Sequence, residues 1–456
     1  MTAPATIHNS LFTIHSSQFT QKTHNMKKTI CILLVLLSSV LGLFAQQADG
    51  WHFAWHGFVN PVLFGDTRQV VSGREGMMLF YPQPVTPDIM GDDVNDVPQL
   101  NMLSITARLN LSFQGPDVLG AKVKGFIEGD FTGATDATIN MLRLCHAYLD
   151  MKWQHDELLA GQYWYAMVIE EIMPGTQPLN MGAPFHPYAR YNQLRYYHRG
   201  LGQSFMKNWE LMAVAAFELD NKSQGPEGSS TAYLRHSLIP EMNLQLRYVG
   251  EHLFAGAAAN YLHIKPIYAL PDDGIERGYF IQVADHVSFS LFAKYRWDNW
   301  TLKCQTLLNS NLYEGCSLGG YIFPDYDPYI DCYPGTLDYT FTTLWADFGK
   351  TTGHWRPGIF AGYAKQNDAE KIDAAMSSGQ PYSNYGRGFD IDYMWRIQPR
   401  IEYYAGNGLS FACEVEHTVA QFLKDTDPDE YRFHREADPD NKPANTRVIL
   451  SAVYAF

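Results

Sequence analysis

Only a few side chains in this sequence have the types and spacing that catalysis or metal binding would need. His52 and His56 fall on one face of an alternating segment, but no third ligand is near them in the sequence. Glu416 and His417 are adjacent, so on a strand they point to opposite faces. The GxSxG, HExxH and P-loop patterns are absent. The sequence therefore predicts no catalytic centre, no metal site and no cofactor.

The N-terminal region indicates export from the cytoplasm. Residues 26–45 begin with two lysines after Met26, continue with an apolar run from Ile30 to Phe44, and end on the small residue Ala45. This is the pattern of a secretory signal peptide, and the run is shorter than the roughly 20 residues of a membrane-spanning helix. We expect cleavage after Ala45. Residues 1–25 are then an upstream extension, disordered or read from a start codon set too early, and residues 46–456 form one domain.

Composition excludes two classes of protein. The formal net charge is −14, which opposes sequence-independent binding of nucleic acid, because phosphate contacts need a surplus of Lys and Arg. No second apolar run approaches the length of a membrane-spanning helix, so a helical membrane protein is excluded. Aromatic residues reach 14%. Such an excess is typical of transmembrane β-barrels, which carry aromatic girdles at both membrane interfaces.

Apolar and polar residues alternate strictly along several segments, which indicates β-strands with one apolar face. In residues 103–113 every odd position is apolar, and residues 287–297 and 300–308 repeat the arrangement. The predicted strands are Trp51–Phe64, Asn101–Gln114, Ala121–Phe131, Asn140–Trp153, Glu157–Met167, Tyr191–Lys207, Trp209–Leu219, Glu241–Gly250, His252–Ile264, Asp285–Trp297, Asn299–Leu312, Asp338–Gly349, His354–Lys365, Arg387–Gly406, Leu409–Phe422 and Thr446–Phe456.

The lengths of the links between these strands favour a barrel over a soluble β-sandwich. Links alternate between long segments, such as 65–100 and 313–337, and tight turns, such as Asp298 and Asn407-Gly408. Outer-membrane barrels have long extracellular loops and short periplasmic turns, whereas a sandwich does not sort its links by parity. The sequence therefore predicts an all-β fold, a closed antiparallel transmembrane barrel of about sixteen strands.

The last predicted strand supports this class. It reads TRVILSAVYAF, with apolar residues on one face up to Tyr454 and Phe456. It resembles the final strand of outer-membrane barrel proteins, in which a terminal Phe is thought to be read by the barrel-assembly machinery. The resemblance implies that this machinery is a partner and that the protein lies in the outer membrane of a Gram-negative bacterium, in contact with lipid and lipopolysaccharide.

A further resemblance lies in the region Lys122 to Gly161, with the motifs KVKGFIEGDFTG, LRLCHAYLDMKW and LLAGQYW. These motifs resemble the opening half of phosphate-selective and dicarboxylate-type porins, and of porin-like proteins from the Bacteroides group. The resemblance implies a sixteen-stranded diffusion channel for small hydrophilic solutes, commonly a homotrimer. Such porins are often rich in lumenal Arg or Lys, whereas this chain is acidic overall.

If the apolar faces contact lipid, the alternating polar residues face the pore. Basic residues predicted to line it are Arg108, Lys122, Lys124, Arg247, Lys294, Arg296, Lys303, Arg396 and Arg447. Acidic residues predicted to line it include Glu128, Asp130, Glu414 and Glu416. Two interpretations remain open: the charges pair across strands and solvate a water-filled lumen, or the cations form a ladder that guides anionic solutes.

The third long link, residues 168–190, is rich in Pro and Met and carries Glu170, Glu171 and Arg190. In porins the equivalent loop often folds inward to narrow the pore, and irregular backbone is tolerated there because water or protein surrounds it. We predict that this link forms the constriction. The alternative is a surface loop that packs against a neighbouring subunit.

Cys316 and Cys332 fall within one long link, where an oxidising exterior permits a disulfide worth about 3 kcal/mol. The alternative is two free thiols. Two acidic clusters, 325–331 and 425–430, lack the spacing of a known calcium loop, so we expect solvated loops there.

Two rival functions remain beside a porin. One is a closed barrel that binds or adheres at the cell surface. The less favoured one is an outer-membrane enzyme, which would need Ser, His and Asn or Asp side chains converging at one rim.

Overall fold

The alternation of side chains gives each strand one face suited to lipid and one suited to a polar interior, so the strands can close on themselves. The computed structural model describes residues 50–133, 135–177, 181–219, 221–267, 282–324, 335–368, 371–372, 382–425 and 435–456. The predicted extension (1–25), the signal peptide (26–45), Cys332 and most of the two acidic clusters lie outside these residues and stay predictions.

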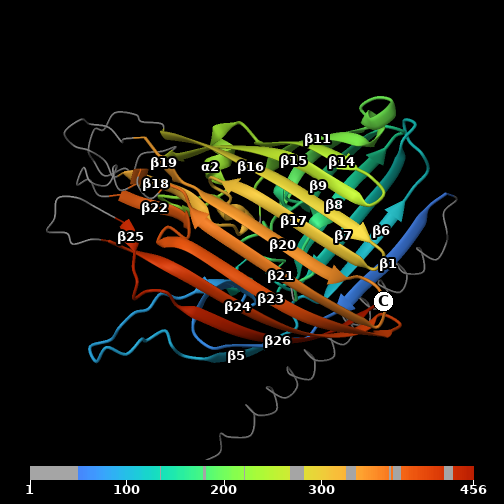
Figure 1. Ribbon diagram of the computed structural model, residues 1–456. Helices are drawn as coiled ribbons and strands as arrows, with labels where there is room; N and C mark the ends of the chain where they lie inside the picture. Colours follow the sequence, from blue (N-terminus) through green and yellow to red (C-terminus); the bar gives the residue numbers. More distant parts are fainter. Residues whose placement is uncertain are drawn as a thin grey trace, which may run out of the picture. The chain divides into compact units, whose positions relative to one another are not determined.

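Within the described residues, sixteen antiparallel strands form one closed barrel (Figure 1). In chain order they are β1 (His52–Val59) continued by β2 (Val62–Asp66), β5 (Gln99–Leu103) continued by β6 (Arg108–Gln114), β7 (Lys122–Asp130), β8 (Arg143–Lys152), β9 (Asp156–Trp164), β10 (Arg190–Arg199), β11 (Trp209–Phe217), β14 (Glu241–Val249), β15 (Leu253–Ile267), β16 (Gln282–Trp297), β17 (Trp300–Asn309), β20 (Phe341–Lys350), β21 (Trp355–Gln366), β23 (Ile391–Gly406), β24 (Leu409–Asp425) and β26 (Ala444–Ala455). Each strand pairs with the next, and β26 pairs with β1 and β2 to close the wall. The predicted fold class is confirmed.

Long and short links alternate around the barrel, as the sequence predicted. The short turns gather at the end of the barrel that carries the C-terminus, and the long links lie at the opposite end (Figure 1). Asp298, Asn407 and Gly408 have φ values of 48°, 50° and 80°, the left-handed geometry that tight hairpins require. We call the two ends of the barrel the turn end and the long-link end.

The long links contain short elements of their own. These are β3 (Val70–Gly73), β4 (Met78–Pro82), β12 (Gln224–Gly225), β13 (Gly228–Ser229), α2 (Ala232–Ser237), β18 (Gly319–Pro324), β19 (Leu337–Tyr339), β22 (Tyr382–Arg387) and β25 (Arg435–Ala437). Among the described residues, no helix is long and apolar enough to cross a membrane.

Three predicted strands are interrupted, each for a local reason. The first breaks at Pro61, which has no backbone N–H to donate to the ladder. The second breaks at residues 104–107, where a turn buries Ile105 at 3% exposure instead of presenting it to lipid. The strand predicted to run to Lys207 ends at Arg199, because Gly200 adopts a φ of 72° and a short 3-10 helix, Ser204–Asn208, follows.

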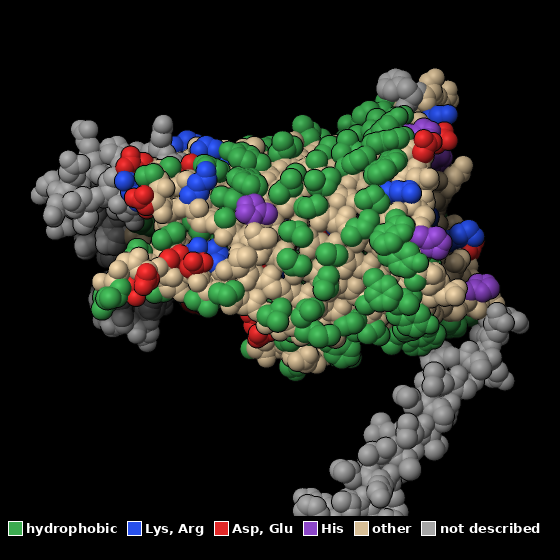
Figure 2. Space-filling model, turned by 60° about the horizontal axis from the view of Figure 1, so that its bottom comes forward, with side chains coloured by type: hydrophobic (Ala, Val, Ile, Leu, Met, Phe, Trp, Pro, Cys, Tyr) green, Lys and Arg blue, Asp and Glu red, His purple; other side chains and the backbone are tan. Residues whose placement is uncertain are grey.

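The outer surface of the barrel is an apolar band. Leu244, Leu291, Leu344 and Leu450, from strands around the wall, are 53%, 60%, 56% and 48% exposed. In the space-filling view, hydrophobic side chains cover the middle of the visible face, and charged side chains lie towards its two ends (Figure 2). Large apolar side chains at such exposure are suited to lipid contact rather than water, so the barrel is built to span a membrane.

The turn end of the apolar band carries aromatic residues, such as the composition indicated for a membrane interface. Near the turn end, Trp297 and Trp300 stack on Phe348 with ring centroids 5.5 and 4.9 Å away. Tyr454 and Phe456 of the predicted assembly signal are 54% and 61% exposed. Their position is compatible with recognition from outside the barrel, which stays a prediction.

Candidate functional site

The described residues of the link between β9 and β10, 165–177 and 181–189, run inside the barrel, and we call them the inward loop. Side chains of the wall reach its backbone: Gln245 donates to Ala166 O at 2.7 Å, Lys303 to Met173 O at 2.6 Å and Arg396 to Ala183 O at 2.7 Å. These three side chains come from β14, β17 and β23. Because β23 lies across the barrel from β9 and β10 in strand order, the loop crosses the lumen.

Carboxylates on the far wall also hold the inward loop by accepting hydrogen bonds from its backbone. Asp347 of β20 accepts from Gly175 N at 3.1 Å. Glu414 of β24 accepts from Gln177 N at 3.0 and 3.1 Å. Irregular backbone at this depth is thus supplied with partners by inward-facing side chains, which is what an interior loop in a membrane barrel requires.

The two glutamates of the inward loop are both paired with wall arginines. Glu170 lies 3.5 Å from Arg195 and accepts a 2.8 Å hydrogen bond from the Tyr163 hydroxyl, and burial raises the pKa of Glu170. Glu171 pairs with Arg247. The contacts hold the short 3-10 turn Glu170–Ile172 against β10 and β14.

Arg190, the third residue predicted for the constriction, behaves differently. It is the first residue of β10, and its guanidinium lies 3.9 Å from the Trp164 ring centroid. It also donates to the Tyr188 hydroxyl at 3.2 Å. Arg190 is therefore a buried anchor where the loop rejoins the wall, and the structure does not bring it together with Glu170 and Glu171.

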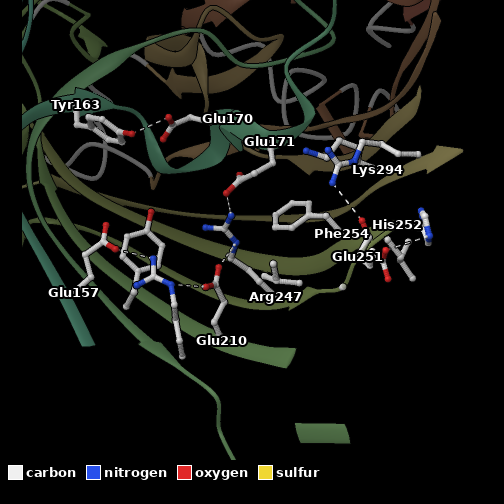
Figure 3. Close-up of a pocket in the computed structure, with 16 residues that line it drawn as sticks. Glu157, Tyr163, Glu170, Glu171, Glu210, Arg247, Glu251, His252, Phe254 and Lys294 are labelled. Atoms are coloured by element: carbon white, nitrogen blue, oxygen red, sulfur yellow. Dashed lines mark hydrogen bonds and ion pairs between the residues drawn. The ribbon is translucent and has the colours of Figure 1, made fainter. Parts of the chain in front are cut away.

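On the turn side of the inward loop lies a cavity of about 370 Å³, which we call the turn-end cavity (Figure 3). Its lining includes Glu157, Tyr163, Glu170, Glu171, Arg199, Glu210, Arg247, Glu251, Phe254, Lys294 and Arg296. A row of contacts runs along it from Glu171 through Arg247 to Glu210, the last at 3.1 Å. Arg199 extends the row, 3.2 Å from Glu210 and 2.8 Å from Glu157. The lining is charged, with both signs alternating.

Several predicted pore-lining residues are likewise in ion pairs. Arg108 lies 3.3 Å from Glu128 and 3.5 Å from Asp130. Arg447 makes a bidentate pair with Asp66, with both nitrogen-to-oxygen distances at 2.8 Å. This second pair joins the first and last strands and so stabilises barrel closure. In these places the cations are neutralised and do not form a free ladder.

Four predicted cations have no carboxylate within ion-pair distance among the described residues: Lys124, Lys294, Arg296 and Lys303. Lys294 and Lys303 are direct cross-strand partners on β16 and β17. Like charges directly opposite each other are destabilising. Lys122 departs from the prediction: its side chain is 70% exposed and lies 3.8 Å from Asp117 in a link, so it belongs to the rim rather than to the lumen.

Arg396 is the most heavily bonded of the predicted lumen residues. It is 1% exposed and pairs with Glu416 at 3.1 Å. Besides Ala183 of the inward loop, it donates to the carbonyls of Leu79 and Phe80, both at 3.0 Å. The hairpin β3–β4 of the first long link is therefore also held inside the barrel, which the sequence reading missed. A signal existed, because Met77 to Phe80 is an apolar run in a link expected to be solvated.

Apolar side chains fill the space between the hairpin, the inward loop and the wall. The cluster contains Met78 and Phe80 from β4, Phe185 from the inward loop, and Trp345 and Phe360 from the wall. Trp345 and Phe360 are 1% and 0% exposed. Such a packed region is unusual for a lumen, whose walls in porins are polar.

No protein-family model and no curated protein sequence matches this chain. Several solved structures do match. The outer membrane channel DcaP of Acinetobacter baumannii is 17% identical to this chain, and the match covers 90% of this chain and 99% of that one at a TM-score of 0.61. The anion-selective porin of Comamonas acidovorans is 11% identical over 89% of this chain and 100% of that one, at a TM-score of 0.51. OmpF of Salmonella typhi is 12% identical over 90% of this chain and 98% of that one, at a TM-score of 0.50.

These likenesses define the class of the fold. The chain has the closed sixteen-stranded barrel of the outer-membrane porins. At such low identities the comparison concerns the fold alone, so the chemistry of the lumen has to be argued from the residues of this chain.

Proposed function

We propose that the protein is a porin of the bacterial outer membrane, through which small hydrophilic solutes diffuse passively. The observation that carries this proposal is the inward loop, bound by charged side chains of the wall and bordered by the charged turn-end cavity. A barrel that served only as an anchor would have no reason to keep a charged, hollow interior at the membrane level. The loop then acts as the constriction, with Glu170 and Glu171 at its edge.

We further propose that the channel prefers anions over cations. This preference is supported by Lys294 and Lys303, which face each other across two strands without a carboxylate partner in the described part of the chain. Arg296, two residues from Lys294, donates to Glu251 O at 3.2 Å and likewise has no carboxylate partner among the residues that the structure describes. An anion passing between the lysines would relieve their repulsion. This extends the resemblance to phosphate-selective and dicarboxylate-type porins, from which a homotrimer is also proposed.

The test is the ion selectivity of purified mature protein in a planar bilayer with a KCl gradient. We expect anions to permeate better than cations, and the double variant Lys294→Gln/Lys303→Gln to lower the anion-to-cation permeability ratio by at least about twofold. Lys122→Gln is the matched control, because Lys122 lies at the rim, and it should leave the ratio unchanged. Cation preference in the unaltered protein would exclude the anion part but keep the porin. Conductance steps in groups of three would support the trimer.

One observation favours a second candidate, a barrel closed by its own loops. The apolar cluster of Phe80, Phe185, Trp345 and Phe360 connects the hairpin, the inward loop and the wall. If the cluster seals the lumen, the protein acts at the surface rather than as a channel. Absence of conductance in protein shown to be folded would establish this alternative and reject the porin.

A further inference from the structure

A groove of about 510 Å³ lies on the outer surface of the barrel, within the apolar band, and we call it the wall groove. Three alanines from β11 and β15 line it, together with larger side chains from β10, β14, β15 and β16. The alanines are Ala213, Ala215 and Ala259, and the larger residues are Leu194, Met242, Leu244, Tyr261 and Val287. In the strand register, Ala215 lies between Leu194 and Met242, so the short side chain leaves a recess between two taller ones.

The position and lining of the wall groove are suited to an acyl chain. Leu194, Leu244 and Val287 are among the exposed apolar side chains of the outer surface, so the groove opens towards lipid. Water in the groove would find few hydrogen-bond partners, and an empty groove would leave its lining without packing contacts on one side. An extended acyl chain fills such a recess without either cost.

A polar cluster borders the groove on the side of the long-link end. The hydroxyl of Tyr261, which lines the groove, donates to Asp285 Oδ1 at 2.5 Å. His263 is the direct cross-strand partner of Asp285, and its Nδ1 atom lies 2.7 Å from the same oxygen. The side chain of Asp285 is 54% exposed, and its Oδ2 atom has no hydrogen-bond partner within the described ranges. Asp285 therefore offers an acceptor on the outer surface.

Lys265 lies beyond this cluster on the same face of β15. Leu262 and Ile264 pack in the interior, so the alternating residues Tyr261, His263 and Lys265 face outward. No carboxylate in the described part of the chain lies within ion-pair distance of Lys265. Because outer-membrane barrels have their long links on the extracellular side, this end of the groove belongs to the outer leaflet.

The order of these groups discriminates between lipid classes. From the groove towards the long-link end come apolar side chains, then the acceptor Asp285, then the cation Lys265. In a phospholipid the phosphate directly follows the glycerol that holds the acyl chains, and an ammonium group lies beyond it, so the order would be reversed. In an acylated, phosphorylated amino sugar the chains join amide and hydroxyl groups, and phosphate lies further out. Its N–H and O–H donors match Asp285, and its phosphate matches Lys265.

We propose that the wall groove binds one acyl chain of the lipid part of lipopolysaccharide, with Asp285 accepting from the amino sugar and Lys265 paired with a phosphate. The proposal places a single lipid site on one face of the barrel, in addition to the general contact of the wall with lipid. It needs the barrel to lie in the outer membrane but does not need it to conduct, so it stands or fails separately from the proposed channel.

Native mass spectrometry of the full mature chain, released from detergent micelles, tests the proposal. The probes are lipid A, an acylated and phosphorylated glucosamine disaccharide, and phosphatidylethanolamine. We expect one lipid A per chain to bind at least about tenfold more tightly than phosphatidylethanolamine. Lys265→Gln should weaken lipid A binding about tenfold, and Asp285→Asn about threefold, because charge-assisted hydrogen bonds are lost. Equal affinities for the two lipids, a preference for phosphatidylethanolamine, or a Lys265→Gln variant that binds lipid A as well as the unaltered protein would overturn the proposal.

A second variant tests the groove itself. Ala213→Phe/Ala259→Phe fills the recess and should lower the affinity for lipid A about tenfold, because the acyl chain loses its packing contacts. Ala346→Phe is the matched control, since Ala346 is also exposed on the outer surface, on β20, and does not line the groove. Circular dichroism of each variant shows whether the barrel has formed. A folded barrel with a filled groove and unchanged affinity for lipid A would also reject the site.

The chain offers a control for the polar cluster as well. Asp156 accepts from the Tyr196 hydroxyl at 2.5 Å and lies 2.8 Å from His198 Nδ1, so the same three residue types meet near the turn end. Asp156→Asn should leave the affinity for lipid A unchanged. If it weakens lipid A binding as much as Asp285→Asn does, the lipid is not held at the long-link end, and the assignment to Asp285 and Lys265 is wrong.

Discussion

Replacing Arg396 by glutamine is expected to give the largest effect of any single substitution in the lumen: a higher conductance and a less stable barrel. Arg396 connects β23 to Ala183 of the inward loop and to Leu79 and Phe80 of the β3–β4 hairpin. Glutamine cannot reach all these carbonyls at once. Both segments should therefore move away from the wall more often, which widens the path through the barrel.

Stability falls in the same variant because Glu416 loses its counter-charge. Both side chains of the Arg396–Glu416 pair are fully buried, and removing one partner of such a pair typically costs about 3–5 kcal/mol. Thermal unfolding followed by circular dichroism measures this loss, and single-channel recording in a planar bilayer measures the conductance. The double variant Arg396→Gln/Glu416→Gln should recover part of the stability, since no buried charge is left unpaired, while the conductance stays high.

Arg356→Gln provides the comparison for a partly exposed pair. Arg356 and Glu402 lie 3.2 Å apart with side chains 26% exposed each, so their pair should contribute about 1 kcal/mol or less. If Arg396→Gln changes neither stability nor conductance more than this control does, the hairpin and the inward loop are held by other contacts, and the role given to Arg396 is wrong.

The barrel could be predicted from the sequence because one rule applies to every strand. Each strand meets lipid on one side and polar space on the other, so the alternation in residues 287–297 and 300–308 is a direct record of the two faces. The alternation of long links and short turns follows from the same antiparallel geometry, because successive links lie at opposite ends of the barrel. The breaks at Pro61, residues 104–107 and Gly200 are local events that occupy only a few residues, and they do not disturb the alternation on either side.

The partners inside the lumen could not be predicted in this way. Alternation says that Arg396 and Glu416 both face inward, but pairing also needs the register between strands, which the hydrophobic pattern does not give. Arg447 and Asp66 meet only because the barrel closes, 381 residues apart in the chain. The hairpin β3–β4 was missed because its apolar run lies in a link. In a link, the two-residue period does not show whether a segment folds into the barrel or away from it.

The second large effect concerns pH and His186, which lies in the inward loop. His186 is fully buried, and its Nε2 atom lies 2.6 Å from Val168 O within the same loop. The ring meets Trp345 of β20 edge to face, with centroids 5.2 Å apart. Burial lowers the pKa of His186 from 6.5 to about 3. The histidine is thus neutral while the loop is docked, and it would bind a proton on release at any pH below about 6.5.

The direction of the pH effect follows from this difference. Between pH 6.5 and 3 the released loop binds one more proton at His186 than the docked loop, so acid favours release. The stabilisation is complete above pH 6.5 and decreases by up to about 1.4 kcal/mol for each pH unit below it. Burial is the main cause of the low pKa of His186, and the nearby charge of Lys303 lowers this pKa further. We expect channels at pH 4.5 to show larger or noisier conductance than at pH 7.5.

Two variants assign the effect to His186. His186→Gln keeps a donor for Val168 O but cannot be protonated, so its conductance should differ much less between pH 7.5 and 4.5. Glu170 acts in the opposite direction. Burial raises its pKa, so the docked loop binds a proton at Glu170 at a higher pH than the released loop does, and a fall in pH therefore stabilises the docked loop. Glu170→Gln should therefore enlarge the response to acid. If His186→Gln responds to acid as strongly as the unaltered channel, the loop is released by another titrating group, and the assignment to His186 fails.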